Sequence, residues 1–316
     1  MFKYMIMIIQ MCVLSVSAAT FKLDANSDLV GSLIQHQISA NDTWFKIAYY
    51  YDVGYDELRA ANQHVKTLSR HVGDTLLIPS MYLLPPKNYR EGIVVNLSEK
   101  RVYYFPDDHT VMTYPVAVGR DGWKTPSFKG RVIRKDISPT WYVPESILAY
   151  YYKKHGVHHP KTVPPGPNNP LGNFVLRLSK TGILIHGTNN DKTVGKRISS
   201  GCIRMYNRNI VELFYVVDIN TLVRFIHEDE KIGSDGSRVY FEKNMKYRPY
   251  DIRSVEMLIK KLSDKGYYLD INYDKLNEVF IKNEGIPIAI GYVDRAHLLG
   301  DLSRGLTAFM YEDSEE

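Results

Sequence analysis

A histidine and a cysteine, a pair able to perform acyl transfer through a thiol, lie close together in HGTNNDKTVGKRISSGCIRM (186–205). His186 follows the apolar run GILI, which predicts the end of a strand, and Cys202 follows a loop. A thiol attacks a carbonyl carbon as the thiolate, and a neighbouring imidazole can take its proton. The stretch therefore predicts nucleophilic catalysis by Cys202 with His186 as the base.

The residues around the cysteine suit a reacting site better than a packed core. Gly201 offers backbone freedom and space for a substrate carbonyl, and the N–H groups of Gly201 and Cys202 could line an oxyanion site. Arg204 could hold a substrate carboxylate or the thiolate. A free cysteine is more often a small buried hydrophobe, but the neighbours Ser199, Gly201 and Arg204 match a core position poorly.

The first nineteen residues have the order of a secretory signal peptide. Lys3 precedes the apolar run 4–16, and small residues follow at 17–19, so we expect export with cleavage near Ala19. The run is too short for a membrane anchor, which needs about 20 apolar residues. Because Cys12 would leave with residues 1–19, the mature chain would keep Cys202 alone and form no intramolecular disulfide.

Length and charge limit the remaining possibilities. A chain of 316 residues can form two or three modest domains, each with its own core. The formal net charge of +5 is mild and there is no long basic run, which disfavours nucleic acid as a partner. Attraction to an anionic polymer or a membrane surface stays open.

Residues 33–80 predict a small βααβ module. QHQI (35–38) and the stretch after Gly73 read as strands, and the segments at 44–51 and 55–63 read as helices. The module resembles a LysM domain at Thr43, Ile47, Ala48, Tyr51, Leu58, Ala61, Asn62, Gly73, Asp74, Leu76, Ile78 and Pro79. This resemblance implies binding to glycans that contain N-acetylglucosamine, peptidoglycan among them; a module without a ligand is the alternative.

The rest of the chain divides into two further regions. Residues 91–244 carry short alternating apolar runs separated by turn residues, which predicts a mostly β catalytic domain, a sandwich or barrel, with one helix at about 207–217. Residues 246–316 predict an α+β accessory region of unknown role, with a helix at 251–266, a shorter one at 276–282, and strands around it. The predicted fold class is therefore α+β multidomain.

The cysteine stretch strongly resembles the signature of the YkuD-type L,D-transpeptidases. The matching positions are His186, Gly187, Thr188, Asn189, Gly195, Ser199, Gly201, Cys202, Ile203, Arg204 and Met205. The likeness extends upstream through 115–126, 139–141 and 163–172, which resemble the Gram-negative ErfK/YbiS/YcfS/YnhG subgroup. Together with the LysM resemblance it covers about residues 35–244.

The resemblance implies a periplasmic enzyme that cuts a peptidoglycan stem tetrapeptide between diaminopimelate and D-Ala through a thioester. The acceptor is a diaminopimelate amine, giving a 3→3 crosslink, or a lysine of an envelope lipoprotein or outer-membrane protein; water would make the enzyme an L,D-carboxypeptidase. The Gly187 carbonyl orients His186, in place of the acid of a Ser-His-Asp triad. No cofactor and no metal are implied. The implied catalytic set is Cys202, His186, Arg204, Gly201, Gly187 and Ser199.

Three alternatives deserve comparison with this reading. A catalytically silent wall-binding protein would have no chemical reason to keep His186, Cys202 and Arg204 together. A papain-like peptidase places its cysteine first and its histidine far downstream, the reverse of the order here. A metal site in HGVHHP (155–160) would need Cys or carboxylate ligands at suitable spacing, so these are better read as loop histidines near the cleft. Ser200 stands where many family members have His, which leaves His186 as the only base.

Overall fold

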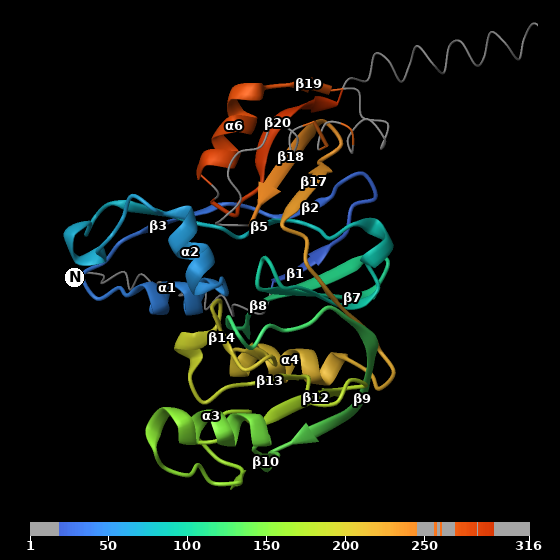
Figure 1. The fold of residues 1–316 in the computed structure, drawn as a ribbon. Helices are drawn as coiled ribbons and strands as arrows, with labels where there is room; N and C mark the ends of the chain where they lie inside the picture. Colours follow the sequence, from blue (N-terminus) through green and yellow to red (C-terminus); the bar gives the residue numbers. More distant parts are fainter. Residues whose placement is uncertain (1–18, 245–255, 258–259, 261–268, 283, 294–316) are drawn as a thin grey trace, which may run out of the picture.

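The computed structural model describes residues 19–244, 256–257, 260, 269–282 and 284–293, and its elements form three packed units (Figure 1). The predicted signal peptide, apart from Ala19, and most of the helix predicted at 251–266 lie outside the described residues. The α+β multidomain class and the mostly β middle region are confirmed by the arrangement of the strands.

The N-terminal module has the predicted βααβ order. Its elements are β3 (Ile34–Gln37), α1 (Trp44–Tyr51), α2 (Tyr55–Ala61), the 3₁₀ turn η1 (Leu68–Arg70) and β4 (Thr75–Ile78). Thr43 caps α1 by accepting a hydrogen bond from the Lys46 N–H at 3.1 Å, which satisfies one of the unpaired N–H groups at the start of the helix. The antiparallel pair β3–β4 and the two helices enclose a core of their own, around Ile47 and Leu58.

The middle unit is a closed barrel. Its strands, in sheet order, are β8 (Thr110–Gly119), β15 (Ile203–Met205), β13 (Leu184–His186), β12 (Phe174–Leu178), β9 (Phe128–Ile137), β16 (Leu222–Ile226), β6 (Gly92–Asn96) and β7 (Arg101–Asp107). β7 pairs again with β8, which closes the sheet and leaves no free edge in the ring. The helix α4 (Asn207–Val216) runs beside it and buries Ile210 and Leu213.

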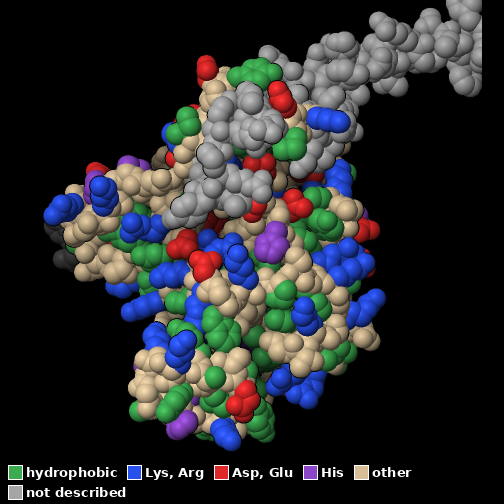
Figure 2. Space-filling view, viewed as in Figure 1, with side chains coloured by type: hydrophobic (Ala, Val, Ile, Leu, Met, Phe, Trp, Pro, Cys, Tyr) green, Lys and Arg blue, Asp and Glu red, His purple; other side chains and the backbone are tan. Residues whose placement is uncertain are grey.

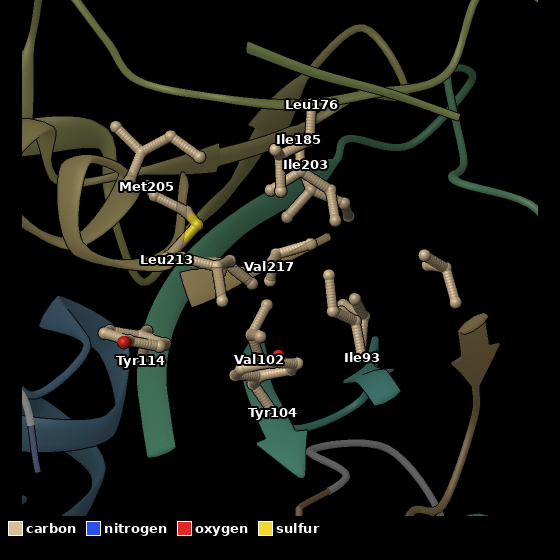
Figure 3. Close-up of a cluster of buried hydrophobic side chains, with 14 of the residues drawn as sticks. Ile93, Val102, Tyr104, Tyr114, Leu176, Ile185, Ile203, Met205, Leu213 and Val217 are labelled. Carbon is tan, nitrogen blue, oxygen red and sulfur yellow. The ribbon is translucent and has the colours of Figure 1, made fainter. Parts of the chain in front are cut away.

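Alternation along the strands fills the barrel. Ile185 of β13 and Ile203 of β15 are register partners, are fully buried, and lie together in the core cluster of Figure 3. Because neighbouring residues of a strand point to opposite faces, the residues on either side of these two isoleucines face away from the core. Those residues include His186 and Arg204.

Shorter elements surround the barrel. They are β1 (Ala19–Lys22), β2 (Leu29–Gly31), β5 (Met81–Leu83), η2 (Lys87–Tyr89), β10 (Trp141–Tyr142), α3 (Glu145–His155), β11 (Thr162–Val163), η3 (Asp191–Thr193) and β14 (Arg197–Ser199). β1 and β14 extend the sheet at β8, and β2 pairs with β5. The sequence did not predict α3, because no residue of this helix is buried and its apolar pattern is weak.

The C-terminal unit is a second sheet covered by a helix. Its elements are β17 (Glu230–Ser234), β18 (Arg238–Lys243), β19 (Leu269–Ile271), α6 (Tyr273–Lys282) and β20 (Ile288–Val293), in the sheet order β17-β18-β20-β19. β17 and β18 lie inside the range 91–244 that the sequence assigned to the catalytic domain, yet they pair with each other, and β18 also pairs with β20. The sheet thus begins before the predicted accessory region.

Buried charges join the three units. Arg101 of the barrel, 1 % exposed, donates to Glu57 of the N-terminal module at 2.7 Å. Lys231 of β17, 3 % exposed, contacts Glu99 and Glu242, each at 3.0 Å. Charges removed from water are tolerated when paired in this way.

The outer surface is mixed in character. Lys and Arg side chains are scattered over the face shown in Figure 2 and do not gather into one block. Within the described ranges, no helix is both long enough and apolar enough to cross a membrane.

Candidate active site

Two adjacent parallel strands place the predicted histidine and cysteine on one face. β13 and β15 pair with His186 opposite Arg204, and Cys202 stands one residue before β15. Strands lie about 4.8 Å apart and rise about 3.3 Å per residue, so an offset of two residues predicts a Cα separation of about 8 Å between His186 and Cys202, which side chains can span. The segment 187–201 therefore connects His186 at the end of β13 to Cys202 just before the neighbouring strand β15.

His186 is buried and held in one orientation. Its Nδ1 lies 2.7 Å from the Gly187 carbonyl oxygen, and since a carbonyl only accepts, Nδ1 carries the proton and Nε2 is the basic nitrogen. Burial lowers the pKa of His186 to about 3, and the charge of Arg204 adds to this shift. The imidazole is therefore neutral near pH 7 and able to accept a proton.

Cys202 is half-buried, and its thiol donates to the Gly182 carbonyl oxygen at 3.4 Å. Burial raises the pKa of the Cys202 thiol, while the Leu184 N–H and the charge of Arg204 act in the opposite direction. The thiol is thus protonated at neutral pH, so a base must remove its proton for it to attack.

Ser199 shapes the turn before the cysteine. Its hydroxyl donates to the Cys202 carbonyl at 2.6 Å and accepts from the Gly201 N–H at 3.1 Å. Gly201 has φ +109°, a conformation that favours glycine. Because its N–H is already donated to Ser199, Gly201 does not supply the oxyanion donor expected from the sequence in this arrangement.

Thr125 is a positioning residue that the sequence did not predict. Its buried hydroxyl donates to the Gly201 carbonyl at 2.9 Å and accepts from the Gly119 N–H at 2.9 Å. It therefore ties the end of β8 to the turn that carries Cys202. The only signal in the sequence was a Thr-Pro pair in a loop, 76 residues from its partner.

Asn207 is a second positioning residue that the sequence did not predict. Its side-chain oxygen accepts from the Thr188 N–H at 3.0 Å, and its nitrogen donates to the Thr188 carbonyl at 2.7 Å. A Cβ added at Gly187 would lie 2.4 Å from that oxygen, which explains the glycine after His186. In the sequence, Asn207 showed only as the start of a predicted helix.

Arg204 carries an unused donor beside the thiol. Its Nη1 donates to the Thr193 hydroxyl at 3.1 Å, and its buried Nε has no hydrogen-bond partner among the residues that the structure describes. Burial also lowers the pKa of the Arg204 guanidinium. A buried donor without a partner is costly, and a bound carboxylate would satisfy it.

Comparison with known proteins identifies the family. The model of the YkuD L,D-transpeptidase catalytic domain matches residues 90–225, and the LysM model matches residues 36–79. Probable L,D-transpeptidase ErfK/SrfK of Salmonella typhimurium is 33% identical over 282 residues, which span 84% of this chain and 88% of that protein. The chain belongs to the L,D-transpeptidase family.

Two Escherichia coli relatives of this L,D-transpeptidase are similar to it at comparable levels. Probable L,D-transpeptidase YcfS is 37% identical over 217 residues, 67% of each chain. Probable L,D-transpeptidase YbiS is 36% identical over 230 residues, 70% of this chain and 74% of the relative. The resemblance to this subgroup and to a LysM domain is thereby confirmed.

The histidines after α3 of the transpeptidase make other contacts. The ring of His158 stacks on Tyr152 with centroids 4.6 Å apart, and His159 Nδ1 lies 2.8 Å from the Pro160 carbonyl oxygen. In the part of the chain that the structure describes, no group of three or more His, Cys, Asp or Glu side chains is arranged to hold a metal ion.

Proposed function

We propose that the chain is a peptidoglycan L,D-transpeptidase that works through a thioester on Cys202. The observation that carries this proposal is the shared face of His186, Cys202 and Arg204 on paired strands, with the Nδ1 of His186 engaged by Gly187. A neutral base, a thiol and an unused cationic donor are the parts that acyl transfer from a carboxylate-bearing peptide needs.

In the acylation step, Nε2 of His186 takes the thiol proton as Sγ of Cys202 attacks the carbonyl carbon of the diaminopimelate residue. The C–N bond to D-Ala then breaks, the imidazolium gives its proton to the leaving amine, and the thioester remains. The Cys202 N–H is the proposed oxyanion donor, since Gly201 donates elsewhere. Arg204 binds a substrate carboxylate through Nε.

In the second step an amine attacks the thioester and releases Cys202. A diaminopimelate side chain gives a 3→3 crosslink, and a lysine of an envelope lipoprotein or outer-membrane protein gives a protein joined to the wall. Neutral His186 takes the proton of the incoming amine and returns it to the thiolate. The LysM module is proposed to bind the glycan, and the residues at 1–19 to direct the enzyme to the periplasm of a Gram-negative envelope.

The test is incubation of the mature protein with a disaccharide-tetrapeptide, followed by mass spectrometry. We expect D-Ala release with a 3→3 dimer, absent in Cys202→Ala and strongly reduced in His186→Gln. D-Ala release without a dimer would point to a protein acceptor or to an L,D-carboxypeptidase. Added lysine-bearing envelope protein separates these two, since only the first becomes joined to the tetrapeptide. Equal product from wild type and Cys202→Ala would overturn the proposal and favour a silent wall-binding protein.

A further inference from the structure

The N-terminal module contacts the segment that leads to the cysteine. Its turn between α1 and α2 packs on the loop of 187–199. A Cβ added at Gly195 of this loop would lie 2.2 Å from the Tyr55 backbone nitrogen and 2.5 Å from the Gly54 Cα. The Lys196 ammonium lies 3.7 Å from the centre of the Tyr55 ring, a cation–π contact. The module therefore touches the loop through backbone and side chain.

This contact lies two residues from a partner of Arg204. Thr193, in the turn η3 of the same loop, accepts the Arg204 Nη1 hydrogen bond at 3.1 Å and is itself buried. Gly195 is held on its other side by a hydrogen bond from its N–H to the Val116 carbonyl at 3.2 Å. Displacing the module would remove its contacts with this loop, and the loop holds the Arg204 guanidinium through Thr193.

A second set of contacts clamps the turn in place. Asp52, which is 5 % exposed, accepts from Asn209 Nδ2 at 2.8 Å and from Arg208 Nη2 at 3.1 Å. The backbone of Asp52 has φ +56°, which is uncommon for residues other than glycine and must be held by the surrounding contacts. Arg208 also donates to the Tyr49 carbonyl of α1. Both arginine and asparagine belong to α4 of the barrel.

We propose that the N-terminal module is a positioning part of the active site, in which Asp52 and Tyr55 hold the loop of Thr193 and Gly195 so that Arg204 meets the substrate carboxylate. The inference rests on the proposed function for the role of Arg204. It predicts that the module matters even when the substrate has no glycan for it to bind. A module that only tethers the enzyme to the wall predicts no such effect.

The test uses the full mature chain and a soluble tetrapeptide without sugar. Asp52→Ala and Tyr55→Ala are expected to raise KM by about tenfold, within the range known for small misplacements of binding groups, with a smaller change in kcat. Asp52→Asn keeps the Oδ1 acceptor and tolerates the backbone conformation, so it is expected to restore most of the affinity. The matched control is Tyr50→Ala, since Tyr50 is 58 % exposed on the same helix as Tyr49.

A second readout keeps the inference testable if the peptide is not turned over. The rate of Cys202 alkylation by iodoacetamide is measured against pH, because a displaced Arg204 no longer lowers the thiol pKa. We expect the profiles of Asp52→Ala and Tyr55→Ala to move to higher pH and that of Tyr50→Ala to stay.

Profiles and KM values equal to those of Tyr50→Ala would overturn the inference. A wild type inactive on the peptide with shifted variant profiles would reject the proposed function alone. If Asp52→Ala does not fold, Tyr55→Ala and Lys196→Ala test the same contact from its two sides.

Discussion

The hydroxyl of Ser199 bridges the peptide groups before Gly201 and after Cys202, since it donates to the Cys202 carbonyl and accepts from the Gly201 N–H. We expect Ser199→Ala to slow Cys202 acylation by about tenfold through loss of this geometry. It should also lower the free energy of unfolding by about 1–3 kcal/mol, because buried polar groups lose their partner. Stopped-flow kinetics measures the acylation rate and urea unfolding measures the stability. Ser200→Ala, at the half-buried neighbouring residue, is the control. Unchanged acylation in Ser199→Ala would contradict the positioning role.

Thr125 offers a cleaner substitution, because Thr125→Val has nearly the same shape and lacks only the hydroxyl. The Gly201 carbonyl and the Gly119 N–H would both lose their bond. We expect destabilisation by about 1–3 kcal/mol and slower acylation, because unpaired buried groups keep their full desolvation cost. Thr125→Ser should recover both properties, as thermal unfolding and acylation kinetics can establish. A Thr125→Val variant that matches the wild type in stability and acylation would contradict the role given to the hydroxyl.

The buried imidazole makes stability depend on pH. His186 has a pKa of about 3 in the folded protein against 6.5 ordinarily, so between these values the unfolded chain binds a proton that the folded chain does not. Stability present above pH 6.5 is therefore lost as the pH falls toward 3, by about 1.4 kcal/mol for each unit of pKa difference. Urea unfolding of wild type and His186→Gln at several pH values measures this. The wild type should lose more stability between pH 7 and pH 4, and parallel curves would refute the assignment.

The ion pair between Glu57 and Arg101 predicts a large effect of a single substitution. Glu57→Ala leaves the buried guanidinium without its closest carboxylate, which costs about 3–5 kcal/mol in comparable pairs. Glu278→Ala also breaks a pair, with Lys282, but on an exposed helix face, and should change stability little. Chemical denaturation of both variants makes the comparison. If Glu57→Ala and Glu278→Ala lost similar amounts of unfolding free energy, burial would not be what makes the Glu57–Arg101 pair stabilising.

Local patterns were enough to predict the N-terminal module and most of the barrel strands. The helical spacing of Trp44, Ile47 and Ala48 marks the face of α1 that is buried, and alternating apolar runs mark strands such as β16. The stretch of 186–205 also predicted a reacting site, because its residue types are unusual for a packed core.

Features that depend on distant partners were missed. β15 has only three residues and owes its strand form to β8 and β13, from which the sequence separates it by loops. The run at 238–243 predicts an ordinary strand, which is β18, and no local signal tells which sheet a strand will join. The use of the Gly201 N–H by Ser199 depends on the conformation of a turn, which residue types alone do not fix.

Lys231 has a consequence for any attempt to excise the catalytic unit. The match to the transpeptidase domain ends at residue 225, but the Lys231 ammonium that lies 3.0 Å from the buried Glu99 carboxylate comes later in the chain. A fragment truncated at residue 225 would leave Glu99 without that cation and would uncover the side of the barrel where Tyr103 donates to it. We therefore expect the shortest stable form of the enzyme to extend beyond residue 225, at least through β18.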